Sequence, residues 1–184
     1  DGQWLNSTYV RCSVDILDIN GSGVDDKTIE YSLSTSGHLG FGDWYKAFTS
    51  APGEQVHAFM DMTANEGEDN YIRWRAKDRA TNGFEVSAPV NIKIDTITPQ
   101  ISDTLMGMKE WFMETSMDLG IEITDEGCGV DPESLFFSIS TEGRNSFGEW
   151  MAISRENLTE IENGFSISVV ANLEEGGDNY IRFS

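Results

Sequence analysis

The sequence has few of the residues that metal sites, redox centres and disulfide frameworks require. Its 184 residues include two cysteines and two histidines. Two cysteines do not make a disulfide framework, and they leave the redox compartment open. His38 and His57 have no spaced partner for a metal site. Because a catalytic base also needs a positioned nucleophile or acid, we expect the chain not to be an enzyme and assign it no catalytic residue.

Basic residues are also scarce. Lysine and arginine number 12 against 32 aspartate and glutamate, which gives a formal net charge of −20. Such a charge repels nucleic acid and anionic membranes, so we expect no nucleic-acid partner. Long apolar runs are missing too: none approaches the 18 or so residues of a membrane helix, and no leader-like segment opens the chain. We therefore expect no membrane span and no signal peptide within it.

Known catalytic motifs are missing from the sequence as well. There is no nucleophile elbow, HExxH, CxxC or phosphate loop. The segment from Asp18 to Gly23 begins like a calcium-binding EF-hand loop, but the twelfth position is Ile29 where a bidentate acid is needed. We interpret this segment as a turn.

An internal repeat dominates what is present. The stretch GSGVDDKTIEYSLSTSGHLGFGDW at 21–44 returns as GCGVDPESLFFSISTEGRNSFGEW at 127–150. Self-similarity at a period near 100 residues, with Gly-bounded strand-like runs inside, is typical of tandem β-sandwich modules. The sequence therefore predicts an all-β chain with two tandem antiparallel sandwiches, at 1–97 and 98–184.

Alternating apolar and polar residues predict the strands. Each copy has such a run before the repeated turn, a second after it, and a third in DNYIRW at 69–74 or DNYIRF at 178–183. The expected inward residues are Val10, Cys12, Val14, Ile16, Ile29, Tyr31, Leu33, Ile72, Trp74, Val90, Ile92 and Ile94 in the first copy, and Met117, Leu119, Ile121, Ile123, Leu135, Phe137 and Ile139 in the second. Trp4-Leu5 matches Trp111-Phe112, and Trp44 matches Trp150. We expect Trp44 and Trp150 to be largely buried anchors of the core or corner.

Several of these residues carry a resemblance to known repeats. The turn Leu173-Glu-Glu-Gly176 and the strand after it resemble the turn and penultimate strand of fibronectin type III-like and bacterial or archaeal Ig-like repeats. Where such repeats commonly have a corner tyrosine, this chain has Asn70 and Asn179, similar to surface-protein repeats of the pattern N-x-I-x-V-R-A-x-D-x-A-x-N. The first copy matches that pattern at Asn70, Ile72, Ala76, Asp78, Ala80 and Asn82, with Trp74 at the valine position, and its exit Asp95-Thr-Ile-Thr-Pro99 resembles their inter-repeat joint.

The resemblance implies a large secreted or cell-surface protein, in which such modules form stalks, lattices or adhesive arrays. Our leading hypothesis is a structural or adhesive repeat located outside the cell or at its surface, with neighbouring protein subunits or repeats as partners. The alternative is an accessory module of a secreted enzyme that binds carbohydrate or protein, for which aromatics such as Trp44 or Tyr45 should be exposed on one face. The fold alone does not choose between them.

Acidic residues gather near the expected joint of the two modules. The sequence offers no other cofactor, but calcium accepts six to eight oxygens from such loops, so a calcium site is a hypothesis here, with a solvated acidic collar as its alternative. Its candidate ligands are Glu66, Glu68, Asp69, Asp95, Asp125, Glu126 and Asp131.

Three further sequence features lead to expectations. Cys12 has the parity of a core residue, which favours a free buried thiol over a bridge to Cys128. The triplets at Asn6 and Asn157 would permit N-glycans in a secreted protein. Because the second copy has no counterpart of Val90, Ile92 and Ile94, we expect a sandwich that lacks its final strand. The open edge beside Asn179 would then be covered by a continuation of the parent protein or by a strand from a neighbour.

Overall fold

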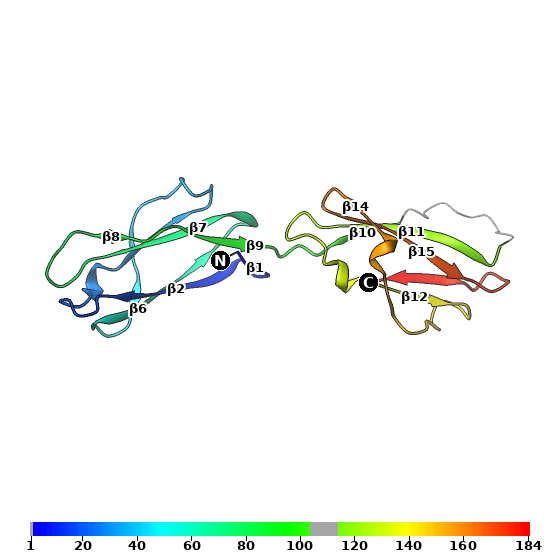
Figure 1. Ribbon diagram of the computed structural model, residues 1–184, viewed down its shortest axis with the longest axis horizontal. Helices are drawn as coiled ribbons and strands as arrows, with labels where there is room; N and C mark the ends of the chain where they lie inside the picture. Colours follow the sequence, from blue (N-terminus) through cyan, green and yellow to red (C-terminus); the bar gives the residue numbers. More distant parts are fainter. Residues whose placement is uncertain (1, 104–113) are drawn as a thin grey trace. The chain divides into compact units, whose positions relative to one another are not determined.

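The computed structural model describes residues 2–103 and 114–184 and is built from β-strands, with short 3-10 turns (Figure 1). The chain divides into two compact units, Asp1–Thr96 and Ile97–Ser184. The predicted all-β class is therefore confirmed. Trp111-Phe112 lies outside the described residues. Among the described residues, no helix is long and apolar enough to cross a membrane.

The first unit contains two sheets. The larger one has the order β1-β9-β7-β3-β4, with β8 also pairing with β7. Its strands are β1 (Trp4–Leu5), β9 (Val90–Ile94), β7 (Gly67–Ala76), β3 (Glu30–Ser34), β4 (Tyr45–Lys46) and β8 (Glu85–Val86). The smaller one has the order β2-β6-β5, formed by β2 (Tyr9–Leu17), β6 (Gln55–Thr63) and β5 (Phe48–Thr49). Figure 1 shows β2 and β6 along one side of this unit and β7 and β9 along the other.

One core joins these two sheets. Period-two alternation turns one face of each strand inward, and the β2 and β6 residues of that parity pack against those of β7 and β9. The buried members are Val24, Ile29, Val56, Ala58, Met60, Met62, Ala64, Ile72, Trp74, Ile92 and Ile94, with Val10, Cys12, Val14, Ile16, Tyr31 and Leu33 partly buried against them. The predicted inward residues are confirmed except for Val90, which is 42% exposed.

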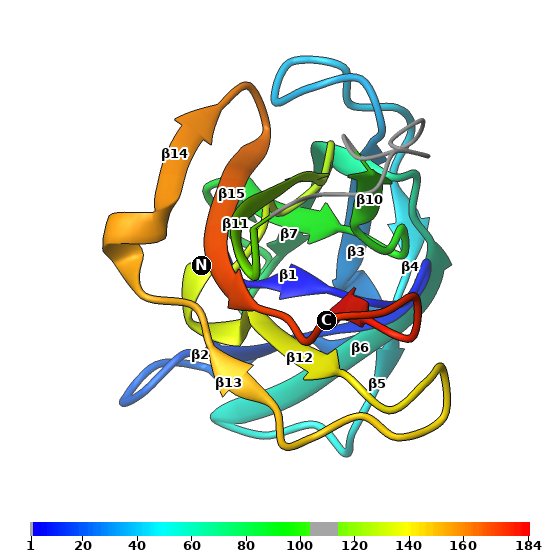
Figure 2. The same ribbon diagram turned by 90° about the vertical axis from the view of Figure 1, so that its right-hand side faces the viewer.

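The second unit has the same two-layer plan. One sheet has the order β10-β11-β15-β14, from β10 (Gln100–Asp103), β11 (Ser116–Thr124), β15 (Gly164–Asn172) and β14 (Leu158–Ile161). The other has the order β13-β12-β16, from β13 (Met151–Ala152), β12 (Phe136–Ser140) and β16 (Tyr180–Phe183). Figure 2 shows β14 and β15 as a hairpin at the edge of the first of these sheets. The predicted inward residues of β11 and β12 lie in or against the core that the two sheets share.

Equivalent 3-10 turns precede the β3 and β12 strands. They are η1 (Asp26–Thr28) and η2 (Pro132–Ser134), and a further turn, η3 (Arg155–Asn157), precedes β14. The Asp25 carboxylate accepts a hydrogen bond from the Lys27 N–H at 3.2 Å, and the Asp131 carboxylate accepts one from the Glu133 N–H at 2.9 Å. An acid in this position satisfies a backbone donor that the turn itself leaves unpaired.

The two units differ at the strands nearest their ends. In the first, β1 runs parallel to β9, with Trp4 opposite Lys93 and Leu5 opposite Ile94. In the second, β10 pairs antiparallel with β11, in the other sheet from β16. The first unit therefore ties its initial and final strands to each other, whereas the second unit holds them in separate sheets.

Candidate functional site

Each unit folds one loop back over the outer face of a sheet, and buried serines hold it there. We call residues 35–44 and 141–150 the covering loops. The Ser32 hydroxyl donates to the Gly42 carbonyl at 2.9 Å, and the Ser138 hydroxyl donates to the Gly148 carbonyl at 2.9 Å. Both serines are 0% exposed although their side chains point away from the core. The loop therefore supplies the cover that the sheet face would otherwise lack.

A second serine and a left-handed glycine fix the start of each covering loop. The Ser34 hydroxyl donates to the Gly37 carbonyl at 2.5 Å, and the Ser140 hydroxyl donates to the Gly143 carbonyl at 2.6 Å. Gly37 has φ of 87° and Gly143 has φ of 104°, values that side chains with a Cβ rarely adopt. The Gly37 N–H also donates to the Asp69 carbonyl at 3.0 Å. The sequence repeat thus encodes a repeated hydrogen-bond pattern.

Aromatic rings of the first covering loop stack on basic side chains of β7. The Arg73 guanidinium lies over the rings of Phe41 and Trp44, at 4.2 and 4.8 Å from their centroids. Arg75 lies over Trp44 at 4.4 Å and over the Phe84 ring at 4.2 Å. Cation-ring contacts of this kind are worth about 0.5–1 kcal/mol each at exposed sites. We call this set, with Lys77 over Phe84 at 4.5 Å, the arginine–aromatic stack.

The second unit repeats the beginning of this stack. Arg182 lies over the rings of Phe147 and Trp150 at 4.2 and 4.4 Å. Phe147 and Trp150 occupy the repeat positions of Phe41 and Trp44. Trp150 also lines a shallow hollow of about 260 Å³ with Phe136 and Ser184.

The structure corrects the prediction that the two repeated tryptophans are largely buried. Trp150 is 44% exposed, and Trp44 is half-buried. Both stand on covering loops outside the sandwich core, where an arginine of the neighbouring strand supports the ring. Period-two alternation cannot place a loop residue, and an aromatic side chain can be held by a cation as well as by a core. A pattern of Phe-Gly-x-Trp with arginines on a later strand is the signal that could have found the stack.

The two arginines of β7 make different contacts on this face. Arg75 donates from Nε to Glu30 at 2.7 Å, and the Lys46 Nζ lies 2.9 Å from the same carboxylate. Hydrogen bonds from Lys46 and then Arg75 lower the pKa of Glu30. Arg73 lies over the rings of Phe41 and Trp44, and its buried Nε has no hydrogen-bond partner.

An asparagine closes the turn before β7 and the turn before β16. The Asn70 side chain accepts a hydrogen bond from the Asn65 N–H at 2.9 Å and donates to the Asn65 carbonyl at 2.8 Å. Asn179 makes the same pair of bonds with Glu174, at 3.0 and 2.8 Å. Asn70 is 1% exposed, so these bonds satisfy a buried amide. Asn70 and Asn179 thus have the same hydrogen-bonding role in the two units.

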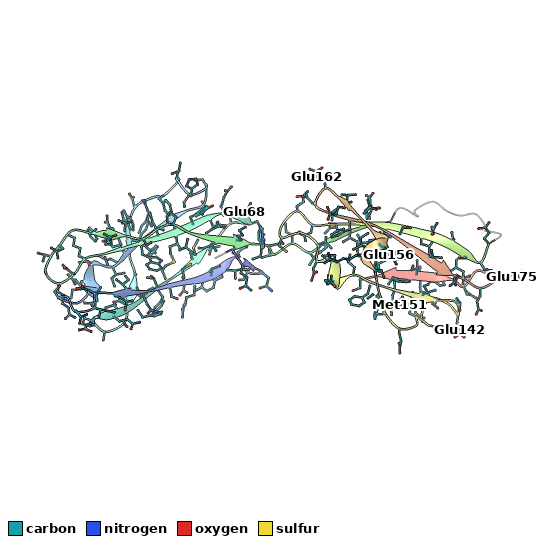
Figure 3. All side chains as sticks on the ribbon, viewed as in Figure 1. Glu68, Glu142, Met151, Glu156, Glu162 and Glu175 are labelled. Carbon is teal, nitrogen blue, oxygen red and sulfur yellow. The ribbon has the colours of Figure 1, made fainter. Side chains whose placement is uncertain are left out.

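The acids proposed for calcium have local contacts in the first unit. Glu66 accepts hydrogen bonds from the backbone and hydroxyl of Thr96, and Glu68 pairs with Lys93 at 2.8 Å. Figure 3 labels Glu68 on this unit. Asp69 is exposed, whereas Asp95 is 9% exposed and donates its N–H to the Leu5 carbonyl at 2.9 Å.

In the second unit, two of these acids accept hydrogen bonds from backbone groups of its turns. The Asp125 carboxylate is 5% exposed and accepts from the N–H groups of Gly127 and Gly129, at 2.8 and 3.4 Å. Glu126 is exposed, and Asp131 caps η2. Each of these contacts works without an ion, and the calcium site stays a prediction.

The cysteine and histidine side chains singled out in the sequence have local contacts. Cys12 is a free, half-buried thiol, and burial raises its pKa to about 11. The His57 Nδ1 lies 3.0 Å from the Asp15 carboxylate, and His38 packs edge-on against Tyr71 at 6.2 Å.

Both glycosylation triplets lie at the surface. Asn6 is exposed in the short connection between β1 and β2, and Asn157 is half-exposed at the end of η3.

The outer face of β2-β6-β5 carries an aromatic platform that was not predicted from the sequence. The rings of Phe48 and Phe59 stack at 5.4 Å, and the Arg11 guanidinium lies 4.8 Å from the Phe59 centroid. Arg11 is also paired with Asp61 at 2.7 Å, which lowers the pKa of that carboxyl. Phe48 is 64% exposed. Phe59 has the polar parity of its strand, and that alternation could have found it.

No protein-family model matches the chain, and no curated protein matches it.

Proposed function

We propose that the chain is a pair of fibronectin type III-like or Ig-like modules that act as structural or adhesive repeats of a secreted or cell-surface protein. Neighbouring subunits or repeats are its partners in this proposal. The sheet orders support the module type, because β9-β7-β3-β4 facing β2-β6-β5 follows the two-sheet plan of such sandwiches. The second unit repeats this plan with β16-β12-β13 facing β11-β15-β14.

The recurrence of the covering loop carries this proposal. In both units the most similar stretch of sequence makes two kinds of contact. Buried serines donate hydrogen bonds to loop carbonyls, and arginines stack on aromatic rings. These contacts fasten a loop to a sheet. The same fastening contacts in both units suit a module whose task is to keep its shape in an array.

Surface labelling of intact cells of the source organism tests this assignment. Antibodies raised against the folded chain should label unpermeabilised cells or the material they secrete. Labelling that requires permeabilisation would contradict the proposal. An antibody against a cytosolic protein of the same cells is the control for membrane integrity.

The alternative of an accessory binding module is favoured by one observation, the exposed platform of Phe48 and Phe59. Tyr45, named in that hypothesis, is 54% exposed, but Trp44 is half-buried in the arginine–aromatic stack. A flat pair of rings beside charged groups can stack on the apolar face of a sugar. A glycan array compares the chain with its Phe48→Ala variant: binding lost in the variant supports this function, and absence of binding by both removes it.

A further inference from the structure

Three asparagines of the chain are followed directly by glycine. The dipeptides are Asn20-Gly21, Asn82-Gly83 and Asn163-Gly164. An asparagine side chain in this dipeptide can react with the next backbone nitrogen, because glycine has no Cβ to shield that nitrogen. All three asparagines are exposed to solvent. Neither the dipeptide nor exposure separates the three sites, so a difference in reactivity must come from how the fold holds each one.

The fold restrains Asn163 through its backbone. Asn163 lies in the turn between β14 and β15 with φ of 60°, and its carbonyl accepts a hydrogen bond from the Asp125 N–H at 2.8 Å. Gly164 is paired with Ile161 on one side and with Thr124 on the other. Bringing the Gly164 nitrogen to the Asn163 side chain requires rotation of the peptide between them, which would break the Asp125 bond and the ladder pairing.

Asn82 is restrained through its side chain. Its N–H donates to the Asp78 carboxylate at 2.9 Å, and its side-chain amide donates to the other oxygen of the same carboxylate. The Thr81 N–H also donates to the Asp78 carbonyl at 3.3 Å. The side chain of Asn82 must therefore leave this carboxylate before the Gly83 nitrogen can reach it.

Asn20 has the backbone conformation of Asn163 without those restraints. Its φ is 62°, and it lies in the loop between β2 and η1. The loop is tied down after this point, where the Val24 N–H donates to the Gly53 carbonyl at 3.0 Å. In the part of the chain that the structure describes, no hydrogen bond reaches the side chain or carbonyl of Asn20, and Gly21 lies outside the strands. This loop can change conformation locally while the sandwich stays folded.

We propose that Asn20 is a site of spontaneous deamidation by water, and that the fold protects Asn82 and Asn163 from the same reaction. The Gly21 nitrogen attacks the side-chain carbonyl carbon of Asn20 and forms a new C–N bond. The bond from that carbon to the side-chain nitrogen breaks, and ammonia leaves with the proton of the Gly21 N–H. Water then opens the cyclic imide at one of its two carbonyls, which gives aspartate or the β-linked isomer isoaspartate.

The reaction changes the loop in two ways. Either product adds a carboxylate to a chain whose formal net charge is −20. The isoaspartate product also lengthens the main chain by one methylene, in a loop whose far end is held by the bond from Val24 to Gly53. This modification goes beyond the proposed function and rests on the geometry of the three sites alone.

Peptide mapping by mass spectrometry follows the three sites while the intact chain is kept in mildly alkaline buffer. We expect deamidation at Asn20 to be at least tenfold faster than at Asn163, with Asn82 between them. In urea the three sites should react at similar rates, because unfolding removes the contacts that distinguish them.

Three variants test the physical reasons. Gly21→Ala places a Cβ beside the attacking nitrogen and should slow the reaction at Asn20 at least tenfold. Gly83→Ala is its matched control, and it should leave the rate at Asn20 unchanged. Asp78→Ala removes the carboxylate that holds Asn82 and should raise the rate at Asn82 toward that at Asn20.

A rate at Asn163 equal to that at Asn20 in the folded chain would overturn the proposal, and so would an Asn20 that does not react. A rate at Asn20 that Gly21→Ala leaves unchanged would also overturn it, because the attack would then not come from the next backbone nitrogen. None of these rates bears on the surface-labelling test, so the two proposals fail separately.

Discussion

At the residue scale, the two corner asparagines make the same bonds in different surroundings. Asn70 is buried and also donates to the Ile92 carbonyl at 3.4 Å, whereas Asn179 is half-exposed. When a buried amide is removed, the groups it bonded lose partners that water cannot replace, at about 1–3 kcal/mol for each group. Asn179 is partly exposed, so water can replace the hydrogen bonds that its side chain makes.

We therefore expect Asn70→Ala to destabilise the first unit by about 2 kcal/mol or more and Asn179→Ala to destabilise the second by about 1 kcal/mol or less. Native-state amide exchange measures the opening free energy of each unit separately within the intact chain. Equal losses in the two units would show that burial does not decide the effect.

Cys12 gives a pH dependence with a defined sign. Its thiol pKa is raised to about 11, first by burial and then by the charge of Asp61, from an ordinary value of 9.0. The neutral thiol is favoured in the folded chain, so its contribution is fully present below pH 9 and is lost as the unfolded thiol ionises between about pH 9 and 11.

Urea unfolding between pH 8 and 11 should therefore show a steeper fall in stability for the natural chain than for Cys12→Ala, in which other groups titrate as before. At pH 8 we also expect a thiol reagent to modify Cys12 at least tenfold more slowly than it modifies an unfolded cysteine. Parallel stability curves for the two chains would contradict this assignment.

At the element scale, the strands could be predicted from alternation, and the covering loops could not. The run from Val10 to Ile16 has a single face that can be buried, so its orientation follows from the sequence. Trp150 belongs to no such pattern, and its position depends on Arg182, which lies on a strand distant in sequence. The covering loop was visible as a repeat, but its hydrogen bonds and its stacking depend on tertiary contacts.

The β11–β15 ladder contains an unusually close backbone approach. A Cβ added to Gly164 would lie 1.9 Å from the Ile123 carbonyl oxygen and 2.8 Å from the Thr124 Cα. Both are backbone atoms of the partner strand and cannot turn aside. Gly164→Ala should therefore destabilise the second unit by about 2 kcal/mol or more.

Gly83→Ala is the matched control for this substitution. An added Cβ at Gly83 meets nothing within 4 Å, so its effect should stay within about 0.5 kcal/mol. The two variants are compared by thermal unfolding and by amide exchange in β11. If both variants unfold at the temperature of the natural chain, the close approach of Gly164 to the β11 backbone is contradicted.

At the scale of the whole molecule, the net charge of −20 opposes the compact state. Acids on loops contribute to this charge: Glu162 and Glu175 project from the turns before and after β15 (Figure 3). Because salt screens charges beyond about 10 Å at 0.1 M, the melting temperature should rise between 10 and about 200 mM sodium chloride.

The same experiment tests the calcium hypothesis from the sequence. Calcium chloride and chelator are compared at matched ionic strength, so that screening is equal. A further rise that only calcium gives would support an ion at the acids from Glu66 to Asp131. Identical melting temperatures in calcium chloride and in chelator would contradict a calcium site and favour a solvated acidic surface.

We propose that the chain consists of two repeated modules that keep their shape separately within an array. The first unit joins its terminal strands directly through the parallel pairing of β1 with β9, so pulling on its ends shears those bonds. The second has no such pairing among its described strands, because β10 and β16 lie in different sheets.

Single-molecule stretching of the intact chain tests this claim most directly. The account predicts two separate unfolding events, each releasing roughly 300 Å of chain for about 90 residues, with the first unit resisting the higher force. Asn70→Ala and Asn179→Ala assign each event to its unit. A single event that releases the whole chain, or extension without any resistance, would contradict it.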